Sequence, residues 1–476
     1  MDRAIPLSRS GDALFHQVYR HLRDAILTGA LAGGEKLPST RGLARELGVS
    51  RTVVLAAYDQ LLAEGLADAR GGSGTYAAVG LAPRETREAS ARISLARYGR
   101  AAASLAGSLD FPGRRPTPLR YDFAYGGRGD IETFPFAMWR RILLRHLRRA
   151  PVHTLDYGSA EGSQDLRAAI AAHLRRSRGV NCEAGQVIVL NGSQQALDLI
   201  ARVLIEPGDR VAVENPLYQG SREIFRTAGA RLAPVAVDQD GLDPARLPTG
   251  ARLVLVTPSH QFPTGAILPL GRRLALLAWA RRQRAVVIED DYDGEFRYEG
   301  QPLESLQSLD REGRVIFVGT FSRTLFSALR IGYLVAPRPL VGPLTAAKWL
   351  CDRHTATLEQ ETLAEFIASG MYERHLRRLR RTILSRREEL LSAVAKYLGD
   401  RVEITGAGSG THIVLWPRGR ATEAAIIAQA AGRGVGVYGI APYFLGRPRR
   451  PGLLLGYHRM READIAEGIR RLAGVI

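Results

Sequence analysis

Three consecutive residues near the middle of the chain have the chemistry of an anion site. Gly192, Ser193 and Gln194 follow the apolar run 187–190, at the point where a helix is expected to begin. Free backbone N–H groups and the positive end of a helix attract negative charge. The pattern favours a phosphate, although any capped helix has the same appearance.

Acidic and aromatic residues stand near two other strand ends. Asp290, Asp291 and Tyr292 come soon after the apolar run 286–288. Carboxylates buried at a strand end are costly unless they pair with a cation or a protonated ring nitrogen, whereas solvated loop acids need no partner. Tyr218, in the segment Asn-Pro-Leu-Tyr, adds an aromatic ring near the same expected edge. A lone tyrosine of this kind is more often part of the core.

A polar turn lies between the apolar runs 315–318 and 333–335. It carries the hydroxyl groups of Thr320 and Ser322 and the guanidinium groups of Arg323 and Arg330. Guanidinium groups bind phosphate and carboxylate through paired N–H donors. The turn therefore adds a fourth segment that is suited to an anionic ligand.

The elements that would position these residues are short apolar runs separated by helical lengths. Strands this apolar predict a largely parallel α/β sheet that is covered on both faces, and ligands of such sheets bind beyond the carboxyl ends of the strands. After about residue 340, longer helices and then short strands predict a smaller C-terminal α/β subdomain. The runs are 187–190, 211–213, 253–256, 286–288, 315–318 and 333–335, with helices over 270–283 and 361–397 and later strands over 412–416, 435–438 and 453–457.

Residues 12–78 have the pattern of a separate small domain. Apolar residues recur every four positions from Leu14 onward, which predicts a first helix. Two further helices are separated by a turn at Gly48, and Ser50 can cap the second of them. This is helix-turn-helix geometry, in which the last helix presents the residues of its first turn to a DNA major groove. Strands on both sides of the glycine-rich tip 71–74 predict a wing.

The composition of the 476 residues is that of an ordinary globular protein, with 45% hydrophobic and 24% charged residues. There is no apolar run of membrane-spanning length and no signal-like start, so we expect a cytoplasmic protein without a membrane partner. The two cysteines are too few for a thiolate zinc site, and no metal site is expected. The net charge of +18 suggests a polyanionic partner, although 63 of the 66 basic residues are arginine, which also fits a composition bias.

The segment LPSTRGLARELGVSRTVVLAAYDQLLAEG, followed by ARGGSGTY, resembles the winged helix of GntR-type bacterial repressors. The resemblance implies a double-stranded DNA operator as partner. Arginine at the start of the last helix is chemically suited to a bidentate guanine contact, and hydroxyls and glycine amides are suited to phosphates. The residues implied to contact DNA are Arg41, Ser50, Arg51 and Thr52 in the helices and Arg70 and Gly71 in the wing.

From about residue 120 to 476 the chain resembles fold type I aminotransferases, through the ordered motifs NGSQQAL, NPLY, PSHQFPTG, EDDYD and SRTLFSALRIG. A winged helix followed by such a domain is the architecture of MocR-type regulators, a branch of the GntR family that senses through pyridoxal phosphate. The resemblance implies a winged helix at 12–78, a linker at 79–119, and an effector-sensing and dimerisation domain at 120–476. Its large part would span about 120–340 and its small part about 341–476.

The same resemblance implies a role for each candidate site residue. Asp290 would hold the protonated pyridine nitrogen, Tyr292 would bond the ring oxygen, and Tyr218 would stack on the ring. The phosphate would be held by Ser193, Gln194, Ser322 and Arg330, with Thr320 as a weaker candidate and Tyr157 contributed by the other subunit of a homodimer.

The sequence departs from the family at the position that carries its chemistry. The family places there the lysine that forms a Schiff base with the cofactor, and this chain has Arg323. A guanidinium group stays protonated and is not an amine nucleophile. The lysines that the chain does have lie in segments from which they would substitute poorly for the missing one: Lys36, Lys348 and Lys396. Two smaller departures are Leu454, near the place of a substrate-binding arginine, and Phe262, where many of the enzymes have asparagine.

Several readings of the pocket remain open. In the first, pyridoxal phosphate binds without a covalent bond or enters already condensed with an amino acid. In the second, Arg323 recognises a different anion. In the third, the lysine was exchanged by engineering. The favoured function is a dimeric DNA-binding regulator whose aminotransferase-like domain senses a small-molecule effector and has no catalytic residue. The alternatives are a pyridoxal-phosphate-dependent aminotransferase with an accessory DNA-binding domain, and a repressor whose second domain serves only dimerisation.

Overall fold

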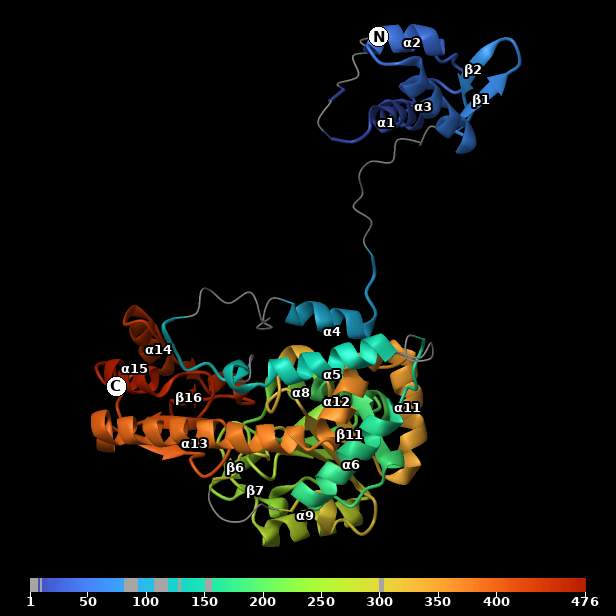
Figure 1. Ribbon diagram of the computed structural model, residues 1–476. Coiled ribbons are helices and arrows are strands. Elements are labelled where there is room, and N and C mark those ends of the chain that lie inside the picture. Colours follow the sequence, from blue (N-terminus) through green and yellow to red (C-terminus); the bar gives the residue numbers. More distant parts are fainter. Residues whose placement is uncertain are drawn as a thin grey trace. The chain divides into compact units, whose positions relative to one another are not determined.

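The structure is a computed structural model that describes residues 7–8, 11–80, 93–106, 119–126, 130–149, 156–298 and 304–476. The chain divides into two compact units, a first unit, Met1–Leu95, and a second unit, Ala96–Ile476 (Figure 1). Segments 81–92 and 107–118 of the expected linker lie outside the described residues. In its described part, helix α4 (Arg97–Leu105) belongs to the second unit and packs against the rest of it, where Arg97 donates a hydrogen bond to the carbonyl oxygen of Ala228.

The first unit has three helices and a hairpin. Ser39 and Ser50 cap the second and third helices, since each hydroxyl accepts a bond from a backbone N–H three residues ahead. Gly48 takes a left-handed conformation, with φ of 63°, and makes the turn between them. The elements are α1 (Leu14–Leu27), α2 (Thr40–Leu47), α3 (Arg51–Ala63), β1 (Ala67–Arg70) and β2 (Gly74–Ala77).

The second unit contains an eight-stranded sheet in the order β4-β11-β10-β9-β8-β5-β6-β7. The pairs β10–β9, β9–β8, β8–β5 and β5–β6 are parallel, whereas β11 runs antiparallel between β4 and β10. The strands are β4 (Val187–Leu190), β5 (Arg210–Asn215), β6 (Arg231–Asp238), β7 (Gly241–Leu242), β8 (Ala251–Val256), β9 (Val286–Asp291), β10 (Val315–Thr320) and β11 (Gly332–Val335).

Helices cover both faces of this sheet, because its central strands are apolar on both sides. One face packs against α7 (Ser193–Leu204), α8 (Gln219–Ala228) and α11 (Arg338–Asp352). The other packs against α9 (Leu270–Gln283) and α10 (Leu306–Leu309) at one end, and against α5 (Phe136–Arg149), α6 (Gln164–Arg178) and α12 (Thr357–Ala368) at the other.

The small subdomain has a separate sheet in the order β12-β13-β16-β15. The long helix α13 (Met371–Tyr397) contributes its first turns to the core beside α12 and its later turns to the core of the small subdomain (Figure 1). The remaining elements are β12 (Val402–Thr405), β13 (His412–Pro417), β15 (Tyr438–Gly439), β16 (Leu453–Gly456), α14 (Glu423–Gly432), α15 (Glu462–Leu472) and the short pair β3 (Tyr121–Asp122) and β14 (Val435–Gly436). Of the described helices, none is long and apolar enough to cross a membrane.

Candidate functional site

The expected site lies where the parallel strands end and the small subdomain packs against them. Asp290 and Asp291 are the last two residues of β9, so their side chains leave the strand on opposite faces. The buried carboxylate of Asp291 accepts two hydrogen bonds from the guanidinium group of Arg178, from Nε at 2.8 Å and from Nη2 at 3.0 Å. Asp290 is only 8% exposed, and its Oδ1 has no hydrogen-bond partner among the described residues. The neighbouring acids therefore differ, because an arginine neutralises only Asp291.

The electrostatic state of Asp290 reflects this difference. Burial, reinforced by the negative charges of Asp291, Glu214 and Asp293, raises the pKa of Asp290 from 3.8 to about 7. A cationic partner on the ligand would reverse this effect, because it favours the carboxylate.

Aromatic side chains pack around Tyr292, two residues after Asp290. Tyr292 donates its hydroxyl to the backbone oxygen of His260 at 2.9 Å and lies 3.0 Å from Nδ1 of the same residue. Tyr125 and Phe262 pack beside it, and both rings contact the imidazole of His412 from the small subdomain. These contacts form an apolar wall at the junction of the two sheets.

Arg323 extends into this aromatic wall. Its Cζ lies 4.2 Å from the centre of the Tyr125 ring, within cation–π range. Tyr218, which is 47% exposed, meets Phe262 of this wall edge-on, with 6.1 Å between the ring centres. Arg323 and Tyr218 therefore both border the aromatic wall.

A second set of polar groups gathers at the start of α7. Arg330, held at φ of 53°, donates to the carbonyl oxygen of Asn191 at 2.7 Å. A Cβ on Gly192 would lie 2.9 Å from that guanidinium, so the close approach requires glycine at this position. Ser193 is the first residue of α7 beside it. The arrangement combines a guanidinium group, a hydroxyl and free helix N–H groups, which is the donor set of a phosphate site.

The other residues expected to hold the phosphate make contacts outside the group formed by Arg330 and Ser193. Ser322 and Thr320 are 3.0 Å apart between their hydroxyl oxygens, in the turn after β10. Gln194 and Tyr218 both lie against Gly220. Tyr157 is 72% exposed, and its ring contacts Arg353 and His354 at the end of α11. Within one chain, these contacts place Tyr157 beside α11 and not beside Asp290.

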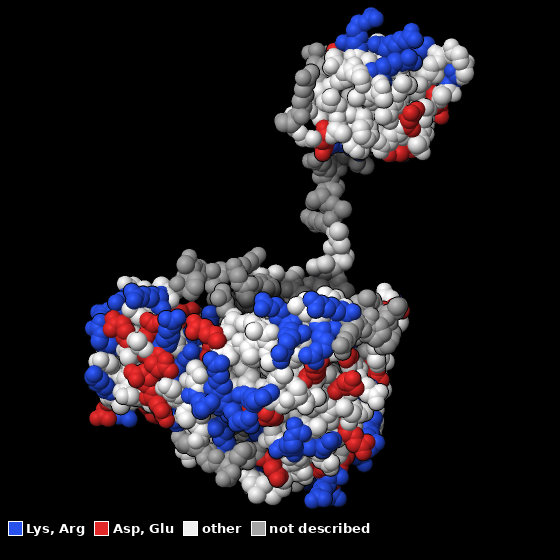
Figure 2. Space-filling model, viewed as in Figure 1, with Lys and Arg blue, Asp and Glu red and all other residues white. Residues whose placement is uncertain are grey.

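The residues expected to contact DNA are exposed on the first unit. Figure 2 shows Lys and Arg gathered at one end of this unit. Arg41 lies on α2, and Arg51 is the first residue of α3. Arg51 contacts the Thr40 hydroxyl at 3.4 Å, and Arg70 stacks on Tyr76 of the wing at 4.4 Å. The hydroxyl oxygen of Ser50 accepts the capping bond and leaves its O–H for a phosphate. Thr52 and Gly71 are also exposed.

Sequence reasoning missed several residues of both surfaces. Lys36, whose Nζ lies 5.8 Å from the centre of the Tyr76 ring, joins the wing through an isolated bridge. In the second unit, four further residues were missed, because they come from segments that only the folded chain brings together: Tyr125, His260, Asp293 and His412. The motif PSHQFPTG contains one of them, but the histidine carries no signal by itself.

The model of the gntR family of bacterial regulatory proteins matches residues 14–77, and that of aminotransferase class I and II matches residues 129–450. The probable rhizopine catabolism regulatory protein MocR of Rhizobium meliloti is 39% identical over 98% of this chain and 94% of its own length. The HTH-type pyridoxine biosynthesis transcriptional regulator PdxR of Corynebacterium glutamicum is 34% identical over 93% of this chain and 91% of its own.

Solved aminotransferases match the second unit. LysN, the alpha-aminoadipate aminotransferase of Thermus thermophilus, was solved in complex with N-(5'-phosphopyridoxyl)-L-leucine and is 30% identical, with a TM-score of 0.69 over 75% of this chain and 91% of its own. The kynurenine aminotransferase of Pyrococcus horikoshii is 27% identical, with a TM-score of 0.70 over 82% of this chain and 96% of its own.

Proposed function

Since this chain belongs to the MocR-type branch of the GntR family, transcriptional regulators with an aminotransferase-like domain, we propose that its second domain senses pyridoxal phosphate bound without a covalent bond. The proposed domain boundaries are 12–78 for the winged helix and 120–476 for the sensor, joined by the linker 79–119.

The single observation that carries the proposal is the buried, unpartnered oxygen of Asp290 at the mouth of the sheet. A protonated pyridine nitrogen is a cation of the right kind for that carboxylate. Tyr218 would cover the ring, Tyr292 would face the ring oxygen, and the donors at Ser193 and Arg330 would hold the phosphate. Gln194 and Ser322 complete the proposed phosphate site, with Tyr157 reaching it from the second copy of a dimer.

Arg323 determines whether the domain can form a covalent bond with the ligand. Pyridoxal phosphate, when bound, supplies an electron-withdrawing ring and an aldehyde that amines attack. Arg323 keeps its proton and offers no free electron pair for that attack, so its role is to hold negative charge or a carbonyl oxygen. Lys348 is fully buried and paired with Asp352 at 2.5 Å, and Lys396 lies on the exposed side of α13. The proposal therefore assigns no catalytic residue to the domain.

A homodimer would place two winged helices on two half-sites of an operator. Large apolar side chains on the outer faces of α5 and α11 support a second copy as partner: Leu144, Leu147, Trp349 and Leu350 are exposed by 41 to 78%. Effector binding would change the population of domain arrangements and so the spacing of the two winged helices. Sedimentation of Leu350→Glu should show more monomer than sedimentation of Leu274→Glu, which alters an exposed leucine of α9.

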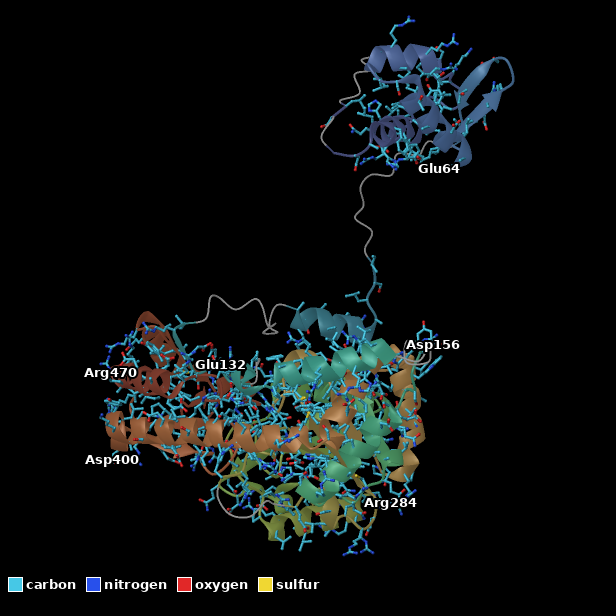
Figure 3. The ribbon with its side chains drawn as sticks, viewed as in Figure 1. Glu64, Glu132, Asp156, Arg284, Asp400 and Arg470 are labelled. Atoms are coloured by element: carbon cyan, nitrogen blue, oxygen red, sulfur yellow. The ribbon has the colours of Figure 1, made fainter. Side chains whose placement is uncertain are left out.

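Calorimetric titration tests the ligand class. The full chain should bind pyridoxal phosphate more tightly than pyridoxal or inorganic phosphate, because only the first engages both Asp290 and the phosphate donors. Arg330→Ala should weaken binding of pyridoxal phosphate and leave binding of pyridoxal unchanged. The matched variant is Arg284→Ala, at the end of α9 (Figure 3). Equal affinity for inorganic phosphate and pyridoxal phosphate would favour recognition of a different anion.

A further inference from the structure

Behind the aromatic wall, three buried side chains from separate segments converge. His260 follows β8, Asp293 follows β9, and His412 begins β13 of the small subdomain. They are 2%, 2% and 0% exposed, and one ligand atom from each lies within 4.8 Å of the other two. His260 Nδ1 is 3.3 Å from Asp293 Oδ2. The group therefore joins the two sheets of the second unit.

Hydrogen bonding fixes His412 with a free electron pair. Its Nε2 lies 2.9 Å from the carbonyl oxygen of Pro263, which only accepts, so Nε2 carries the proton and Nδ1 is unprotonated in the neutral ring. Nδ1 has no hydrogen-bond partner among the described residues. A metal-bound histidine usually has this arrangement, with its second nitrogen donating to a backbone carbonyl.

The other two residues of the cluster also have polar atoms that form no hydrogen bond with the described residues. Neither carboxylate oxygen of Asp293 has a hydrogen-bond partner in the described part of the chain, and the same holds for Nε2 of His260. The neighbouring Arg178 is already paired with Asp291, and Arg323 stacks on Tyr125. A buried carboxylate beside two imidazole rings, one of which presents a free electron pair, requires a cation, a proton or ordered water.

Local packing keeps the carboxylate and the imidazole close together. A Cβ on Gly410 would lie 2.4 Å from His260 Nδ1 and 2.8 Å from Asp293 Oδ2, so a side chain at this position would enter the cluster. The backbone of Gly410, at φ of 79°, is also in the left-handed region that favours glycine. Both features allow the chain to pass directly beside the cluster.

We propose that His260, Asp293 and His412 bind one divalent transition-metal ion of the zinc type, which links the large sheet to the small subdomain. Two imidazoles and one carboxylate are ligands that Zn²⁺ accepts with a fourth position open. Neighbouring ligands of tetrahedral zinc lie about 3.4 Å apart, so the widest pair of the cluster must close by up to about 1.4 Å. Because Tyr292 bonds His260, the ion would also hold Tyr292 in place. The metal site does not depend on the proposed function.

The test uses the tag-free full chain, stripped with a chelator and then titrated with Zn²⁺ and with Co²⁺ as a spectroscopic probe. The proposal predicts about one ion per chain, visible Co²⁺ bands of low-symmetry nitrogen and oxygen coordination, and a higher melting temperature with Zn²⁺. His412→Ala should weaken binding at least tenfold. The control His354→Ala, which removes a histidine at the end of α11, should leave it unchanged.

A near-isosteric substitution provides a second test in case the alanine variant misfolds. Asp293→Asn keeps the shape of the side chain and removes its charge, so it should fold, as judged by near-ultraviolet circular dichroism, and still bind Co²⁺ more weakly. The buried hydroxyls of Ser409 and Thr411, which lack partners among the described residues, offer the competing explanation of an ordered water network. Failure of the wild-type chain to hold a stoichiometric ion, or equal binding by His412→Ala, would overturn the metal site and favour water.

Discussion

The guanidinium group of Arg323 lies against the ring of Tyr125, with 4.2 Å between Cζ and the ring centre. The contact joins the turn after β10 to the segment that follows β3. It also places a permanent positive charge in the pocket, because a guanidinium group does not release its proton near neutral pH. The proposed site therefore has a guanidinium group, and no amine, at the position of residue 323.

Arg323→Lys should restore the missing amine. With pyridoxal phosphate added, this variant should develop the absorption band of an imine, and borohydride should fix the cofactor on residue 323. Arg284→Lys, a change of the same kind at the exposed end of α9, should show no such adduct. If Arg323→Lys forms no band, the pocket has diverged at more than this one residue.

Asp290→Asn should weaken ligand binding and stabilise the ligand-free protein. The pKa of Asp290 is raised from 3.8 to about 7, so the folded state binds the proton more tightly than the unfolded state does. The stability that the protonated group contributes is complete below about pH 4 and is lost as the pH rises to about 7. At pH 8 the variant should therefore be more stable by up to about 4 kcal/mol, with the gap closing toward about pH 4.

Urea unfolding at pH 8 and pH 5 measures this difference in the absence of ligand, and titration with pyridoxal phosphate measures the cost to binding. Lower stability of Asp290→Asn at pH 8, or unchanged ligand affinity, would show that Asp290 is not the unpartnered acid of the pocket.

Arg51→Ala should weaken operator binding by roughly 1 to 3 kcal/mol if the guanidinium makes a bidentate base contact. The operator is obtained by selection of random duplexes with the full chain, and affinity is measured at fixed salt. Arg20→Ala, on the exposed side of α1, changes the net charge equally and is the control. The same loss in both variants would mean that Arg51 acts only through charge.

Asp352→Asn should destabilise the second unit by about 3 kcal/mol, because it leaves the buried Lys348 ammonium without its partner. Asp352 also accepts bonds from Asn191 at 2.6 Å and Gln195 at 2.7 Å, which tie α11 to the start of α7. In urea, the double variant with Lys348→Met should recover part of the loss. An unfolding midpoint like that of the exposed Asp240→Asn would rule out this role.

Much of the fold was predictable because its central strands are apolar on both faces. Val187–Leu190 and the helix Leu270–Gln283 have the boundaries that the sequence predicted. Strand β6 was missed, since Arg231–Asp238 contains Pro234, which argues against a strand, and buries only Val235 fully. The longer helices predicted over 361–397 are the later part of α12 and the whole of α13, and Gly370, in a left-handed conformation, separates them.

The candidate site was predictable only where a motif stands at a strand end. Asp290 and Arg330 belong to such motifs, and the structure brings both to one edge of the sheet. The stacking of Arg323 on Tyr125 and the cluster around His412 depend on contacts between segments more than one hundred residues apart. No local pattern encodes such contacts, so they require the folded chain.

Non-covalent binding is tested most directly by a fluorescence and absorbance titration of the full wild-type chain with pyridoxal phosphate, followed by borohydride and intact-mass measurement. We expect saturable binding and an unchanged mass, because Arg323 retains the ligand without forming a bond to it. No saturable binding, or a mass increase that shows a reduced covalent adduct, would contradict this expectation.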